Sequence, residues 1–113
     1  MAQNRNKLIE LFVGNIANSI VHEILEKAAQ DMELSNRYNK ELKTSFEIAK
    51  KYRNKINPLN NPIPDKDIIY IKSKITKKVR TELSLRISKG YENIDLNLVE
   101  DLVDKFLKDV KVI

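Results

Sequence analysis

The chain lacks cysteine, and its 113 residues include only two glycines, three prolines and one histidine. Without cysteine there is no disulfide scaffold, no thiolate nucleophile and no cysteine-based zinc or iron–sulfur site. Two glycines and one histidine cannot supply a glycine-rich phosphate loop, a nucleophile elbow or a Ser/His/Asp set. We therefore expect a protein that is not an enzyme, with no catalytic residues and with neither a metal nor an organic cofactor.

Long apolar runs are also missing. No stretch approaches the ~20 consecutive apolar residues of a membrane-spanning helix, and the first residues lack the pattern of a signal peptide. These two absences predict a cytoplasmic protein with no membrane partner. Apolar residues nevertheless make up 42% of the chain, which is enough for the packed core of a single domain.

Apolar residues recur at spacings of 3, 4 and 7 in four stretches, which is the period of amphipathic helices. The predicted helices cover residues 4–31, 36–56, 65–89 and 95–111. All three prolines fall in residues 57–64, which predicts a non-helical crossover there. Gly90 is a natural stop for the third helix. A short strand over residues 68–75, which are rich in β-branched side chains, is the competing interpretation.

The pattern predicts an all-α fold, a four-helix antiparallel bundle made of two helical hairpins joined by the Pro-rich loop. The apolar stripe of the first helix is wide, which suggests a central helix. The fourth helix has more apolar width than one contact requires, because Leu98, Leu102 and Leu107 flank its seam. This surplus favours a homo-oligomer in which the first or the fourth helix completes a bundle between chains.

Charge is distributed unevenly along the chain, whose net charge is +5. Residues 35–57 hold seven basic and two acidic side chains, and residues 65–91 hold eight and three. The outer parts, residues 1–34 and 92–113, hold more acidic than basic side chains. If the second and third helices are neighbours, as in an up-down-up-down bundle, the molecule has one positive and one negative flank.

Basic and aromatic side chains are interleaved in the two middle helices, a pattern that suits phosphate contacts and base stacking. The candidate residues for binding a nucleic acid or an acidic protein are Lys50, Lys51, Tyr52, Arg53, Lys55, Lys66, Tyr70, Lys74, Lys77 and Arg80. An ordinary solvated face is the alternative, since lysine outnumbers arginine by 16 to 5, as an AT-rich genome would produce.

Two weaker patterns indicate other kinds of site. His22 and Glu26 are one helical turn apart and could orient a base or supply two ligands. We expect His22 instead to make local hydrogen bonds at a surface or interface. Glu100, Asp101 and Asp104 could attract a divalent cation, but a solvated face is the preferred interpretation.

Taken together, these features favour a non-enzymatic helical module for assembly or protein interaction, with self-association as the expected contact. The alternative is a small basic nucleic-acid-binding protein that uses the Lys/Arg/Tyr-rich face of the second and third helices.

Overall fold

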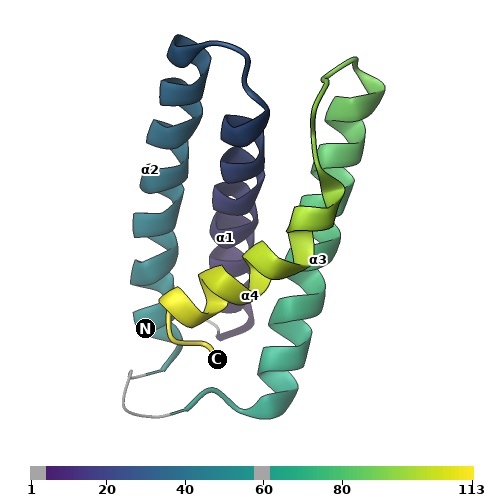
Figure 1. The fold of residues 1–113 in the computed structure, drawn as a ribbon. Helices are drawn as coiled ribbons and strands as arrows, with labels where there is room; N and C mark the ends of the chain where they lie inside the picture. The colour runs from purple at the N-terminus through teal and green to yellow at the C-terminus, as the bar shows by residue number, and fades with distance from the viewer. Residues whose placement is uncertain (1–4, 58–61) are drawn as a thin grey trace.

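The computed structural model describes residues 5–57 and 62–113. Their regular structure is helical throughout, which confirms the all-α prediction (Figure 1). The elements are α1 (Arg5–Ala28), α2 (Met32–Ile56), α3 (Asp65–Ser88), the 3₁₀ turn η1 (Leu96–Leu98) and α4 (Val99–Asp109). The strand alternative for residues 68–75 is wrong, because they lie within α3. Residues 58–61 of the predicted crossover fall outside the described residues.

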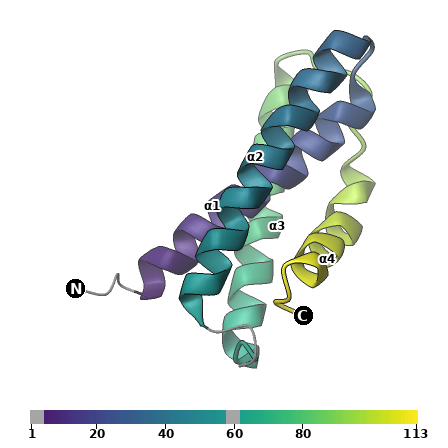
Figure 2. The ribbon, with the colours of Figure 1, turned by 90° about the vertical axis from the view of Figure 1, so that its left-hand side faces the viewer.

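α1 is the centre of the fold. It packs against α2, α3 and α4, and α2 and α3 lie on its two sides (Figure 1). α4 crosses one face of this three-helix layer obliquely, as the side view shows (Figure 2). The expected side-by-side packing of the second and third helices is therefore wrong. The physical reason is the wide apolar stripe of α1, which needs three neighbours to cover it.

The surplus apolar surface that suggested self-association is used inside the chain. Leu102 and Leu107 of α4 are buried in the core, and Leu98 is half-buried against it. By length and composition alone α1 could cross a membrane, but 67% of its most apolar window is buried among the other helices. The burial of the α4 leucines and of the apolar surface of α1 follows from the central place of α1 and the packing of α4 on it.

Capping interactions set the helix ends, and they explain where the predicted bounds were displaced. α2 begins four residues earlier than predicted, because the Asp31 carboxylate accepts a hydrogen bond of 2.7 Å from the Leu34 N–H. α4 begins later than predicted, because Asp95 accepts from the Asn97 N–H and starts η1 instead. Gly90 ends α3 as expected: it has φ +98°, and the next N–H, of Tyr91, returns to the Arg86 carbonyl.

The two glycines should respond in opposite directions to alanine. Gly14 lies within α1, and a Cβ there would meet nothing within 4 Å, so Gly14→Ala should stabilise the fold by about 0.5–1 kcal/mol. Gly90→Ala should destabilise it, because alanine is strained at φ +98°. Urea unfolding followed by circular dichroism measures both changes. Destabilisation by Gly14→Ala would mean that α1 needs glycine for packing.

Candidate functional site

A groove of about 570 Å³ runs between α1 and α3, and none of the residues that line it comes from α4. We call it the α1–α3 groove. Its lining is Gly14, Ala17, Asn18 and Val21 from α1, and Lys74, Lys77, Lys78, Thr81 and Glu82 from α3. A second hollow of about 340 Å³, lined by Glu10, Val13, Tyr70, Lys74 and Lys78, shares two lysines with it and extends it toward the beginning of both helices.

α3 carries basic side chains on two flanks, and α4 covers only one of them. On the covered flank, Lys72 forms an ion pair of 2.8 Å with Asp104, and Arg80 pairs with Glu100. Side chains two residues apart on a helix leave it about 200° from one another. Lys74 therefore points away from α4 and into the α1–α3 groove, and Lys78 follows one turn later.

The lysines of the groove are not neutralised by neighbouring carboxylates. In the described part of the chain, Lys74, Lys77 and Lys78 form no ion pair. Glu82, at one end of the groove, is paired with Arg86 at 3.2 Å. The groove therefore offers three ammonium groups to a ligand, with Glu10 as the remaining carboxylate at its far end.

The structure separates the predicted binding residues into groups. Tyr70, Lys74 and Lys77 meet in the α1–α3 groove and its extension, as parts of one face of α3. Lys66 is exposed at the beginning of the same helix but does not line the groove. Lys78, which was not among the predicted residues, joins them because it lies one turn after Lys74.

The candidates on α2 do not extend this group, since α1 lies between α2 and α3. Lys51 is exposed, the Tyr52 ring is half-buried against the core, and Lys55 lies over that ring at 5.6 Å from its centroid. Lys50 pairs with Glu47 at 2.8 Å. Arg80, on α3, faces α4 rather than the groove.

Arg53 is wrongly assigned as a ligand-binding residue, because it is buried with 2% of its surface exposed. Its guanidinium donates to the carbonyl oxygen of Lys111 from Nη2 at 2.8 Å and from Nε at 3.3 Å. It also donates to the Asn57 carbonyl at 3.0 Å. Burial lowers the pKa of Arg53, and its role is to join the C-terminal residues to the end of α2.

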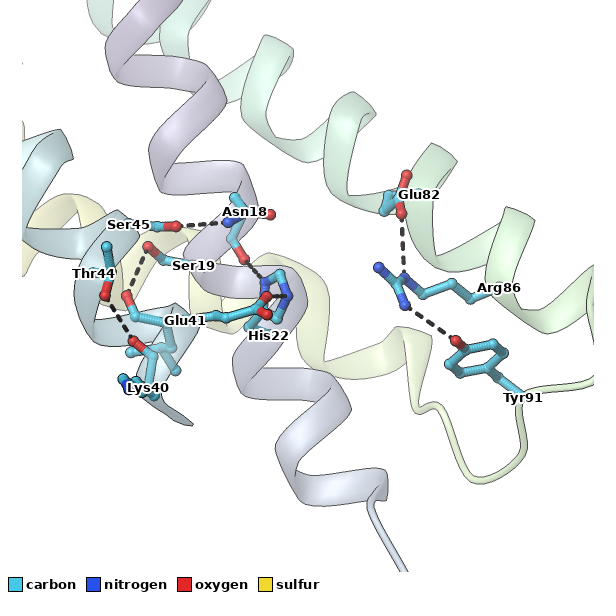
Figure 3. A network of polar contacts seen from close by, with 11 residues as sticks. Asn18, Ser19, His22, Lys40, Glu41, Thr44, Ser45, Glu82, Arg86 and Tyr91 are labelled. Atoms are coloured by element: carbon cyan, nitrogen blue, oxygen red, sulfur yellow. Dashed lines mark hydrogen bonds and ion pairs between the residues drawn. The ribbon is translucent and has the colours of Figure 1, made fainter. Parts of the chain in front are cut away.

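A polar network joins α1 to α2 (Figure 3). The Asn18 amide donates to the Ser45 hydroxyl at 2.6 Å, and His22 Nδ1 lies 2.7 Å from the Asn18 carbonyl oxygen. The other ring nitrogen of His22, Nε2, lies 2.6 Å from the Glu41 carboxylate. His22 thus makes a local hydrogen bond, to Asn18, as expected, but it is buried between two helices of the chain and its carboxylate partner is Glu41. Glu26 instead accepts from the Asn39 amide.

This network limits what His22 can do. Its ring is buried between α1 and α2, and both nitrogens already face oxygen atoms, so neither is free for a substrate or a metal. The Tyr38 ring lies 5.8 Å away, and burial, followed by the charge of Tyr91, raises the pKa of the Tyr38 phenol. The network therefore holds the two helices together.

The acidic side chains of α4 form ion pairs rather than a cation site. Across residues 5–57 and 62–113, no three His, Asp or Glu side chains are grouped closely enough to hold a metal ion. Two of the three candidates, Glu100 and Asp104, are the partners of Arg80 and Lys72. Asp101 is exposed on the same helix.

The ion pair of Arg80 and Glu100 predicts how part of the stability depends on pH. The Arg80 hydrogen bond, helped by a backbone N–H, lowers the pKa of Glu100 from its ordinary value of 4.5. The pair's contribution to stability is therefore complete above that ordinary value and is lost as the pH falls through the lowered one. Carbon-13 NMR of the side-chain carboxyl should show this low pKa. Arg80→Gln should return it toward the ordinary value, and an unchanged titration would contradict the assignment.

Comparison of the chain with protein-family models, with curated proteins and with solved structures found no match. The functional conclusion therefore depends on the groove and its charges.

Proposed function

We propose that the chain is a non-enzymatic helical interaction module that binds an anionic partner in the α1–α3 groove. The observation that carries this proposal is that carboxylates pair with the basic side chains on one flank of α3 and not with those on the other. On one flank, the acidic helix α4 pairs with Lys72 and Arg80. On the other, Lys74, Lys77 and Lys78 have no carboxylate partner within the described residues.

The charge of the groove also bears on self-association. A symmetric dimer through this surface would bring two copies of the three lysines into one interface, and close approach of like charges there costs several kcal/mol. Self-association through α1 or α4, which the sequence favours, would therefore use another surface. Light scattering at tens of micromolar protein tests it, and a monomer there would count against a homo-oligomer.

Heparin chromatography tests whether the groove is a localised anion-binding surface. Lys74→Glu/Lys78→Glu should elute at distinctly lower salt than the wild-type protein, because both changes lie in the groove. The matched control is Lys40→Glu/Lys43→Glu, which changes the net charge equally but at exposed positions of α2. Equal elution of the two variants would show that only net charge matters, and the proposed function would then be wrong.

A further inference from the structure

On its α1 side, the exposed residues of the α1–α3 groove are small or polar. Ala17 and Val21 are buried, and α1 presents mainly Gly14 and Asn18. Among the described residues, the large exposed aliphatic side chains, such as Met32, Ile69 and Leu85, do not line the groove. An amphipathic partner helix needs an apolar groove for its anchoring residues. Since no such anchoring side chains line it and three ammonium groups follow its α3 side, the groove suits a ligand that is negatively charged along its length.

One aromatic ring lies at the end of this basic wall. Tyr70 is 44% exposed, and the Lys74 ammonium lies 5.7 Å from its ring centroid. Tyr70, Lys74 and Lys78 are each one turn apart, so the ring and the two ammonium groups follow each other along α3 in steps of about 6 Å. A row of cations with an accessible ring is the combination that binds single-stranded nucleic acids, whose bases are free to stack.

We infer that the α1–α3 groove binds a single strand of nucleic acid, with its phosphates along Lys74, Lys77 and Lys78 and a base stacked on Tyr70. This inference rests on the proposed function and names the class of its partner. A duplex does not use the same site, because its bases are already stacked on one another and cannot cover the tyrosine ring. Gly14 leaves room for the strand to approach the backbone of α1.

Fluorescence anisotropy with labelled single-stranded DNA and RNA of about twelve nucleotides, close to the usual site size of such grooves, tests the inference directly. Each contact with a phosphate of a single strand adds about 0.7 to the steepness with which log affinity falls against log salt concentration. Three such contacts predict a roughly twenty-fold loss of affinity between about 50 and 200 mM salt. Lys74→Gln/Lys77→Gln/Lys78→Gln should weaken binding at least about tenfold at the lower salt and flatten this dependence. Glu10→Gln should strengthen binding, because it removes a carboxylate beside the strand.

The stacking contact has its own pair of variants. Tyr70→Ala should weaken binding by about 5- to 150-fold, the loss of one stacked base, whereas Tyr70→Phe should keep it. Tyr91→Ala is the matched control, since Tyr91 is similarly exposed and also lies near a cation, Arg86, but does not line the groove. Circular dichroism confirms that the variants fold.

Two further probes separate this inference from the proposed function. If a labelled oligoglutamate peptide binds and the lysine variant loses it, while neither single strand binds, the inference is wrong and the proposed function stands. If a duplex of the same length binds as tightly as the single strand and Tyr70→Ala has no effect, the inference is wrong in the same way. If no anionic probe binds at low salt, both fail.

Discussion

Replacing Arg53 by alanine should lower the free energy of unfolding by about 3 kcal/mol, since a buried hydrogen bond from a charged donor contributes about 1.5–3 kcal/mol. The guanidinium satisfies carbonyl oxygens from two distant parts of the chain, Lys111 and Asn57. Alanine would leave both without this donor and would open a cavity at the end of α2. Urea unfolding measures the loss, and hydrogen exchange of the Val112 amide should become faster.

The chemistry of the replacement separates charge from shape at this position. Arg53→Met keeps most of the volume and removes the cost of burying a charge without a carboxylate, so it should be less destabilising than alanine. Arg37→Ala is the matched control, because Arg37 is exposed on the same helix, and it should change stability by less than about 0.5 kcal/mol. Equal, small effects at both positions would contradict a structural role for Arg53.

Truncation of Phe12 to alanine should cost about 3–5 kcal/mol, the usual range for a large buried aromatic side chain. Phe12 is completely buried on α1, the helix against which the other three pack. Since a domain of this size is stable by about 5–15 kcal/mol in total, the variant should unfold at far lower urea concentration with an unchanged denaturant slope. Circular dichroism during urea titration provides the measurement.

The control for Phe12 is an apolar side chain that the fold does not bury. Ile69 on α3 is 70% exposed, so Ile69→Ala should shift stability by less than about 0.5 kcal/mol. A loss comparable to that of Phe12→Ala would mean that Ile69 is covered in solution, as it would be in an oligomer. A small loss at Phe12 itself would contradict the central position of α1.

The helices could be predicted from the sequence because each has its own apolar period, and because the prolines and Gly90 mark where the second and third of them end. Their arrangement could not, because the period shows which face of a helix is buried but not which neighbour buries it. The width of the stripe on α1 did indicate a central helix. The assumption of a square bundle then made α2 and α3 neighbours, whereas α1 lies between them.

The contrast between local spacing and helix arrangement also explains which residues of the candidate site could be predicted. Tyr70, Lys74 and Lys77 share one face of a helix, so their proximity follows from spacing alone. Gly14 and Asn18 could be added only once α3 was known to lie beside that side of α1. Arg53 does carry a signal in the sequence, since it falls on the apolar seam between Ala49 and Ile56. Its carbonyl partner at Lys111 is 58 residues away, beyond any local pattern.

The central position of α1 couples ligand binding to the stability of the whole molecule. A ligand in the α1–α3 groove contacts α1, which packs against α2, α3 and α4, so unfolding of any part of the core disturbs its site. Such a ligand acts by mass action on the folding equilibrium, adding about 2.7 kcal/mol when its concentration is a hundred times its dissociation constant. Occupancy would then be read as a rise in melting temperature, which makes thermal shift a screen for partners that needs no label.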